Sequence, residues 1–314
     1  MTATTDIGTF EVARRRPGER RRSRIILTLL LSLFLLYSFM PLVYLVLSAT
    51  KTNGDLFTTF GFGFGTEFNF WQNLSDLLAR DNGVFMRWMF NSLLYSTVAG
   101  LGAAILATAA GYALAKFKFV GRNLLFALVL GAVMIPQTAL VVPTFLLLAL
   151  SGLSDNPLGV ILPSMISPIG VYLMRVYIEQ GVDDELLDAA RLDGAGEFVI
   201  FRAIVLRLVA PGMVTVALLS FVGTWNNYFL PLIVLRSQEY QPITVGLATW
   251  YQLAQQGGGG GQVLFSIIIT GALADGALSR SVARRCQWPR HEPWLAPARQ
   301  SCERSVPRAF EAHH

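Results

Sequence analysis

The sequence is poor in charge: of its 314 residues only 14% are Asp, Glu, Lys or Arg, whereas 53% are hydrophobic. A soluble domain of ordinary composition carries about 25% charged residues. Cysteine and histidine are equally scarce, since the two cysteines and three histidines all follow residue 285. The body of the chain therefore has no disulfide framework, metal site or histidine-based catalysis, and we expect it to face lipid.

Lysine is rare too, and the phosphate-binding pattern G-x-x-x-x-G-K-[ST] is missing. Of the three lysines only Lys51 is followed by threonine, and Thr50 rather than glycine precedes it. The chain therefore does not bind ATP by that route, and no other catalytic set is present. The +5 net charge lies in blocks between apolar runs, not in one patch, so we expect no nucleic-acid partner.

Five uncharged apolar runs are long enough to cross a membrane as helices, which takes about 20 residues. The predicted spans are residues 25–47, 88–114, 124–150, 157–174 and 208–235. The first is too long for the core of a signal peptide, so we expect it to be retained. A sixth run, 263–274, ends at Asp275 and is truncated. The predicted fold class is an all-α integral membrane protein with a six-helix bundle.

Basic residues alternate across these spans. Of the 25 lysines and arginines, 21 lie in segments 1–24, 116–122, 175–207 and 280–314. Because basic loops stay in the cytoplasm, the pattern predicts that these four segments are cytoplasmic. Residues 1–24, with seven arginines, are thus interpreted as a basic cytoplasmic N-terminus, and 25–86 as the first span with its extracytoplasmic loop.

Two features of the predicted spans concern helix packing. The second span carries a small residue at every fourth position, which predicts a smooth face for close helix contact; these residues are Ala99, Ala103, Ala107 and Gly111. Prolines interrupt the third and fourth spans and predict kinks; they are Pro136, Pro143, Pro163 and Pro168. A kinked helix can line a pathway or simply pack around a neighbour, and both interpretations stand.

Between the first two spans, glycine alternates with phenylalanine from Gly61 to Gly65, and Phe70 and Trp71 follow. Aromatic rings settle at membrane interfaces because they are half apolar and half polar. The stretch could therefore lie along the outer membrane face, or it could be an irregular surface loop.

A charged island separates the fourth and fifth spans. Asp183 can cap a short helix with its side-chain oxygen. Val182 and Leu187 occupy the positions of a hydrophobic staple. Gly194 and Gly196 predict the end of the helix, since glycine adopts the left-handed conformation found at helix ends. The helix could dock on a partner or merely cap two spans.

This island, residues 183–207, resembles the EAA loop of permease subunits of binding-protein-dependent ABC importers. The likeness rests on Asp188-Ala189-Ala190, Asp193-Gly194-Ala195, Ile204 and Leu206. In that family the loop is a cytoplasmic coupling helix seated in a groove of the ATPase subunit. Asp188 stands where the family usually has glutamate, and Arg207 where a proline usually follows. The resemblance implies that the ATPase-coupling residues are Glu185, Asp188, Ala189, Ala190, Asp193, Gly194 and Ala195.

The fifth span carries the pattern F-x-x-x-W-N-x-Y, formed by Phe221, Trp225, Asn226, Asn227 and Tyr228. Amides inside a membrane are costly unless they pair across helices or face water. They could thus be interhelical hydrogen-bonding groups, or pathway residues whose aromatic and amide groups suit a sugar. The pattern is similar to that of carbohydrate-importer permeases of the maltose type, and the likeness extends over residues 91–273.

The resemblance implies a MetI-like, type I importer permease of the bacterial cytoplasmic membrane, with its core at residues 87–279. Its expected partners are a second permease subunit, two copies of a cytoplasmic ATPase, an extracytoplasmic solute-binding protein, a sugar and membrane lipid. The chain itself would be no enzyme, and ATP and magnesium would bind the ATPase. The alternative is a stand-alone secondary transporter or channel, although such proteins usually carry ionisable groups inside their spans.

The composition changes after residue 280, where arginine, proline and tryptophan accumulate without apolar periodicity. We hypothesise that residues 280–314 are an aberrant tail created by a frame shift near Leu273. A genuine basic tail is the rival interpretation, and with it the chain could be a non-functional permease fragment. A metal site at Cys286, His291 and Cys302 fits no standard finger spacing.

Overall fold

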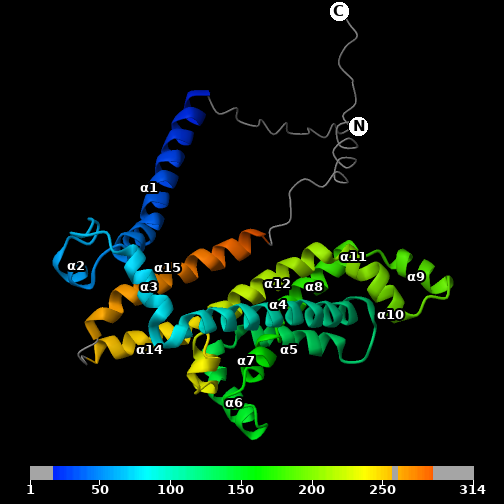
Figure 1. Cartoon of the computed structure of the whole chain (residues 1–314). Coiled ribbons are helices and arrows are strands. Elements are labelled where there is room, and N and C mark those ends of the chain that lie inside the picture. Colours follow the sequence, from blue (N-terminus) through cyan, green and yellow to red (C-terminus); the bar gives the residue numbers. More distant parts are fainter. Residues whose placement is uncertain (1–16, 257–260, 286–314) are drawn as a thin grey trace, which may run out of the picture. The chain divides into compact units, whose positions relative to one another are not determined.

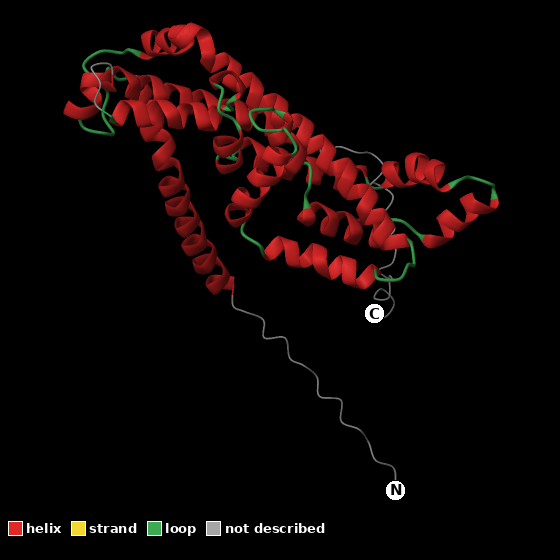
Figure 2. Ribbon diagram, turned by 90° about the horizontal axis from the view of Figure 1, so that it is seen from below, coloured by secondary structure: helices red, strands yellow, loops and turns green. Residues whose placement is uncertain are grey.

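The computed structural model describes residues 17–256 and 261–285, and every regular element in this part of the chain is helical (Figure 2). Two compact units are present. Among the described residues, one contains residues 17–77, 251–256 and 261–273, and the other contains residues 78–250 and 274–285.

The first unit begins with α1 (Pro17–Ala49), which continues through Pro41 without a break. Its segment Arg24–Ala49 is 26 residues long and apolar enough to cross a membrane, which confirms the first predicted span. Most residues of this segment are exposed, whereas Ser48 and Ala49 at its end are buried. The short helix α2 (Asn53–Thr58) and then α3 (Phe70–Ala79) follow. The predicted irregular loop after the first span is therefore partly helical.

The second unit is built on α4 (Val84–Lys116), which packs along α8 (Pro168–Gly181) and α12 (Ala210–Trp225) (Figure 1). These contacts are close. A Cβ atom on Gly100 would lie 2.9 Å from the carbonyl oxygen of Ala217, and one on Gly111 would lie 2.9 Å from the amide nitrogen of Arg175. Small residues let membrane helices approach this closely. The predicted small face is confirmed as buried, at Ala99, Ala103, Ala107 and Gly111.

The third predicted span is two helices, not one kinked helix. α5 (Arg122–Met134) and α6 (Gln137–Leu150) meet at 107°. Pro136 stands at the break, because a residue that precedes proline is driven out of the helical conformation, and Ile135 is extended with ψ 123°. Pro143, by contrast, lies inside α6, and the helix continues through it. The predicted interruption is confirmed at Pro136, and the predicted kink at Pro143 stays a prediction.

The fourth predicted span is longer than expected. α7 (Leu158–Ser164) and α8 together form one candidate span that reaches Gly181 rather than Met174. Pro163 lies in the last turn of α7. Pro168 is the first residue of α8, and Ser167 caps that helix by accepting a hydrogen bond from the Gly170 amide at 3.1 Å. Proline suits a first helical position, so Pro168 begins a helix here.

The fifth predicted span is also divided. α12 ends at Trp225, and α13 (Phe229–Val234) begins after a non-helical step at residues 226–228. At its other end α12 meets the preceding helical segment with a bend of 78°. That segment consists of α10 (Glu197–Ile200), the π-helical turn η2 (Phe201–Val205) and α11 (Leu206–Leu208). Further elements of the described chain are η1 (Arg80–Gly83), η3 (Gln238–Tyr240) and α14 (Ile243–Gln255).

The sixth run forms α15 (Gly261–Arg285), which does not end at Asp275. Its apolar part, Phe265–Ala277, is shorter than a membrane span. By length and composition, three helices of the described chain can cross a membrane, or five if each bent pair is one span. Cys286, His291, Cys302 and the rest of the predicted tail beyond Arg285 lie outside the described residues, and the frame-shift hypothesis stays a prediction.

Candidate functional site

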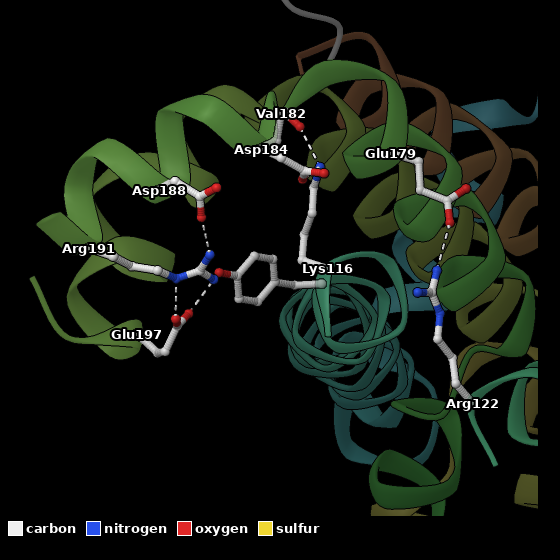
Figure 3. Close-up of polar contacts among 9 residues, drawn as sticks. Lys116, Arg122, Glu179, Val182, Asp184, Asp188, Arg191 and Glu197 are labelled. Atoms are coloured by element: carbon white, nitrogen blue, oxygen red, sulfur yellow. Dashed lines mark hydrogen bonds and ion pairs between the residues drawn. The ribbon is translucent and has the colours of Figure 1, made fainter. Parts of the chain in front are cut away.

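The charged island forms α9 (Asp184–Leu192), preceded by Asp183 at the cap position. The Asp183 side chain makes no capping hydrogen bond, which corrects the predicted role of this carboxylate. Lys116, the last residue of α4, fixes the start of the helix instead. Its Nζ donates to the carbonyl oxygen of Val182 and to Oδ1 of Asp184, both at 2.6 Å (Figure 3). This hydrogen bond and the lysine charge lower the pKa of the Asp184 carboxyl.

Leu187 attaches α9 to the helix stack. It is 1% exposed and packs with Val182 in one apolar cluster, as the predicted staple requires. Burying a leucine side chain stabilises a fold by about 1.5–3 kcal/mol. The cluster draws on α4, α8 and α12 as well as on the island; its other members are Ala104, Ala107, Tyr112, Met174, Ile178, Ile200, Val205, Val209 and Val216.

The end of α9 is a Schellman turn. The Ala195 amide donates to the Ala190 carbonyl and the Gly194 amide to the Arg191 carbonyl, each at 3.0 Å. Gly194 has φ +83°, the left-handed conformation that this turn needs. Gly196 has φ −74° and instead precedes α10. The predicted helix end is thus confirmed, with Gly194 alone in the left-handed region.

A cluster of charged side chains holds α9 to α10 and to α4. Arg191 donates from Nη1 to Asp188 Oδ1 at 2.8 Å and from Nε to Glu197 Oε1 at 2.7 Å (Figure 3). The Tyr112 hydroxyl donates to Glu197 Oε2 at 3.2 Å. The hydrogen bonds to Glu197 and Asp188 raise the pKa of Arg191. We call residues 183–200 the arm, and these contacts give it a defined geometry.

A neighbouring contact holds the turn between α4 and α5 against α8. Arg122 Nη2 lies 3.4 Å from Glu179 Oε1 (Figure 3). Arg175 Nε donates to the same oxygen at 2.9 Å, and its guanidinium lies 3.7 Å from the centroid of the Phe126 ring on α5. These contacts tie α5 to α8, the helix that leads into the arm.

The outer surface of the arm is exposed and lies beyond the ends of the α4 and α8 helices (Figure 1). Leu192 is 90% and Phe198 74% exposed, and Leu186 and Val199 are exposed beside them. Contiguous exposed apolar residues with a polar rim mark interaction surfaces. Of the predicted coupling residues, Ala190 and Ala195 are half-buried, whereas the exposed members are Glu185, Asp188, Ala189, Asp193 and Gly194.

The predicted pathway residues lie at the break between α12 and α13. Trp225 is 2% exposed, stacks on Phe221 and donates from Nε1 to Asp275 Oδ1 at 2.9 Å. Asn226 is exposed, and its amide donates to the Val222 carbonyl of its own helix at 2.9 Å. The break therefore combines a buried aromatic stack with one exposed amide.

The other two residues of the motif are half-buried. The main-chain carbonyl of Asn227 accepts a hydrogen bond from the Thr244 hydroxyl at 3.0 Å. The Tyr228 ring meets the Phe229 ring edge-on. Sequence reasoning missed Asp275, which it took as the end of an apolar run. A buried indole N–H usually finds an acceptor, so a tryptophan in one span and a lone acid in another were the signal for this pair.

Comparisons with known proteins agree with this architecture. Residues 100–285 match the family described as "Binding-protein-dependent transport system inner membrane component". The chain is 34% identical over 227 residues to the arabinooligosaccharides transport system permease protein AraQ of Bacillus subtilis, which covers 72% of this chain and 80% of that protein. It is 40% identical over 167 residues to AraQ of Halalkalibacterium halodurans, covering 53% of this chain and 60% of that relative.

A solved structure shows the same fold. It is the crystal structure of a bacterial ABC transporter involved in the import of the acidic polysaccharide alginate, with a TM-score of 0.71 and 21% identity. The match covers 91% of this chain and 98% of the solved one. From the family match over residues 100–285 and the similarity to AraQ, we conclude that the chain is a multi-pass inner-membrane transport subunit and belongs to the permease family of binding-protein-dependent ABC importers.

Proposed function

We propose that the chain is the translocation subunit of an ATP-driven sugar importer and that the arm couples it to a partner ATPase. The coupling proposal rests on one observation, which is that one side of the arm is exposed and the other side packs against the helix stack. Its outer surface exposes Leu192 and Phe198, whereas its inner side inserts Leu187 into the helix stack. A partner that moved the exposed side would therefore also move α4 and α8, because packed elements transmit displacement.

The energy for this movement would come from outside the chain, since the sequence carries no phosphate-binding loop. The proposed assembly contains a second permease subunit, two ATPase subunits that bind ATP and magnesium, and a solute-binding protein. The distribution of lysine and arginine supports a cytoplasmic arm and a cytoplasmic N-terminus. Closure of the ATPases would rock the permease subunits between inward and outward access.

The sugar class rests on two observations. Both AraQ relatives are arabinooligosaccharide transport permeases by name. In addition, the exposed Asn226 directly follows the buried aromatic stack of Phe221 and Trp225 at the break after α12. Aromatic faces and amides are suitable contacts for the CH faces and hydroxyls of a sugar. We propose that the substrate passes this break.

A glycine pair in the arm tests the coupling proposal. Gly194→Val places a β-branched residue at φ +83°, where such residues are true outliers, whereas Gly196→Val is a matched control at φ −74°. Neither glycine has an atom near its Cβ position, so neither change creates a clash. We expect Gly194→Val to abolish uptake by the reconstituted complex while membrane insertion stays intact, and Gly196→Val to retain uptake.

Equal uptake by the Gly194→Val variant and the unchanged chain would overturn the coupling role. A separate measurement addresses the alternative of a stand-alone transporter or channel. Uptake by the chain in vesicles without any nucleotide-hydrolysing subunit would support that alternative and contradict the importer.

A further inference from the structure

The segment that follows α1 exposes aromatic side chains to an unusual degree. Phe60 is 77%, Phe64 72% and Trp71 71% exposed, and Phe57 and Phe68 in the same segment are exposed as well. We call residues 56–71 the aromatic loop. A soluble surface seldom carries so many large apolar side chains together, and a contiguous group of them indicates a binding or membrane surface.

The interior of this region is polar, the reverse of a soluble fold. Lys51 is 1% exposed and donates from Nζ to the Phe60 carbonyl at 2.8 Å and to the Thr59 hydroxyl at 3.0 Å. Buried Asp55 accepts from the amide and the hydroxyl of Thr66, each at 3.0 Å. These hydrogen bonds fix the backbone of the aromatic loop while its rings point outward. The exposure of the rings is thus a property of an ordered structure.

Buried Asn73 closes the same polar interior at the end of α1. Its Nδ2 donates to the carbonyl oxygens of Ala49 at 3.0 Å and Lys51 at 2.9 Å. Glycine brings the aromatic loop close, because a Cβ on Gly65 would lie 2.6 Å from Asp55 Oδ2. The loop is therefore folded onto the end of the first span by specific contacts.

A ring contact gives the depth of the aromatic loop along the span. Phe62 meets Tyr44 of α1 edge-on, with ring centroids 5.6 Å apart, and a Cβ on Gly61 would lie 3.1 Å from the Tyr44 ring. Tyr44 precedes the end of α1 at Ala49 by about 7 Å of helix rise. The loop thus turns back alongside the span.

The length of the span places this contact in the membrane. Arg24–Ala49 has 26 residues, which corresponds to about 39 Å of helix. A bilayer is about 30 Å thick in its hydrocarbon core and about 40–45 Å with its headgroups. A point about 7 Å inside the end of such a helix lies at the boundary between headgroups and acyl chains.

We propose that the aromatic loop is a membrane-interface anchor, with its phenylalanine rings inserted among lipid acyl chains at the end of α1. Interfacial segments bury their apolar face at this boundary, which is where the Tyr44 contact places the loop. The lipid-facing surface is continuous with α1, whose large apolar side chains from Ile25 to Val46 are mostly exposed. The anchor requires only that α1 spans the membrane and is independent of the coupling proposal.

Site-directed spin labelling tests the anchor in the full chain, reconstituted with its partner subunits in lipid nanodiscs. Phe60→Cys and Phe64→Cys are labelled in a background in which Cys286 and Cys302 are serine. Glu67→Cys is the matched control, because Glu67 is exposed on the same loop but charged. We expect labels at 60 and 64 to be several-fold more accessible to oxygen than to a water-soluble nickel complex, and the label at 67 to show the opposite preference.

Two outcomes would overturn the proposal. In the first, labels at 60 and 64 are as accessible to the nickel complex as the label at 67, so that the rings lie in water. In the second, these labels are shielded from both reagents, so that the rings face a protein subunit. Because oxygen and nickel accessibility are measured without transport, a failed coupling proposal would leave the result unchanged.

Discussion

The arm and the aromatic loop bury opposite kinds of side chain. The arm inserts Leu187 into an apolar cluster and carries its charged groups at the surface. The aromatic loop exposes phenylalanine and is held by the buried residues Lys51 and Asp55. Hydrophobic burial lowers the free energy only where the alternative is water. The difference fits the two proposals, in which the arm meets a protein partner in water and the aromatic loop inserts into lipid.

Both regions nevertheless use a buried lysine in the same way. Lys51 and Lys116 each donate to a main-chain carbonyl, at 2.8 and 2.6 Å, and so fix a turn that local sequence leaves open. Lys116 has a carboxylate partner in Asp184, whereas the partners of Lys51 are a hydroxyl and a carbonyl. The charge arrangement therefore differs even where the hydrogen-bonding role is shared.

The largest expected effect is that of replacing Leu187, the buried residue that attaches the arm to the helix stack. Leu187→Ala should cost about 2–5 kcal/mol, since it removes a fully buried leucine and leaves a cavity. We expect loss of uptake and faster proteolysis within the arm. Leu192→Ala is the control on the same helix, where 90% exposure predicts a change in unfolding free energy within about 0.5 kcal/mol. Equal unfolding free energies of the two variants would show that Leu187 does not attach the arm to the helix stack.

Replacing Lys116 and Lys51 one at a time should affect the two regions in different ways. Lys116→Met and Lys51→Met should each cost about 1–3 kcal/mol, because a buried carbonyl oxygen loses its donor. We expect Lys116→Met to lower uptake by loosening the start of α9, and Lys51→Met to increase protease cleavage in the aromatic loop. Exposed Lys118→Met is the control for loss of a positive charge. Cleavage of the loop that is unaffected by Lys51→Met would contradict its polar interior.

The smallest expected effect is the pH dependence of the arm. The hydrogen bond from Lys116 lowers the pKa of Asp184, so this contact stabilises the arm above the ordinary aspartate pKa of about 3.9. The stabilisation is lost as the pH falls from that value through the lower pKa of the folded arm. We expect hydrogen exchange in the first turn of α9 to show this acid-induced loosening and Asp184→Asn to abolish the dependence. A dependence that survives in Asp184→Asn would assign it to another group.

Several parts of the fold follow from local sequence. The spans at α1 and α4 were predicted because uncharged runs of this length have no other stable environment. The small face of α4 followed from its four-residue period. The position and the end of α9 followed from Asp183 and Gly194, because helix caps are determined by neighbouring residues.

The sequence predicted the positions of helix breaks only in part. Pro136 marks a real break, whereas Pro143 lies inside a continuous helix, and the same residue type has both outcomes. Whether proline breaks a helix depends on what replaces the lost hydrogen bond. In a membrane that replacement can come from neighbouring helices, hydroxyl side chains or water, which hydrophobic periodicity does not specify.

The sequence by itself determined which segments are apolar enough to cross a membrane, where the arm lies, and that this chain carries no phosphate-binding loop of its own, because length, charge and glycine positions act locally. Only the tertiary structure decided that Lys116 fixes the start of α9 and that Asp275 accepts a hydrogen bond from the Trp225 indole. It also decided that Lys51 is buried while the phenylalanines of the aromatic loop are exposed. Each of these depends on groups brought together from separate parts of the chain. A hydrogen bond depends on distance in space, and hydrophobic periodicity carries no information about it.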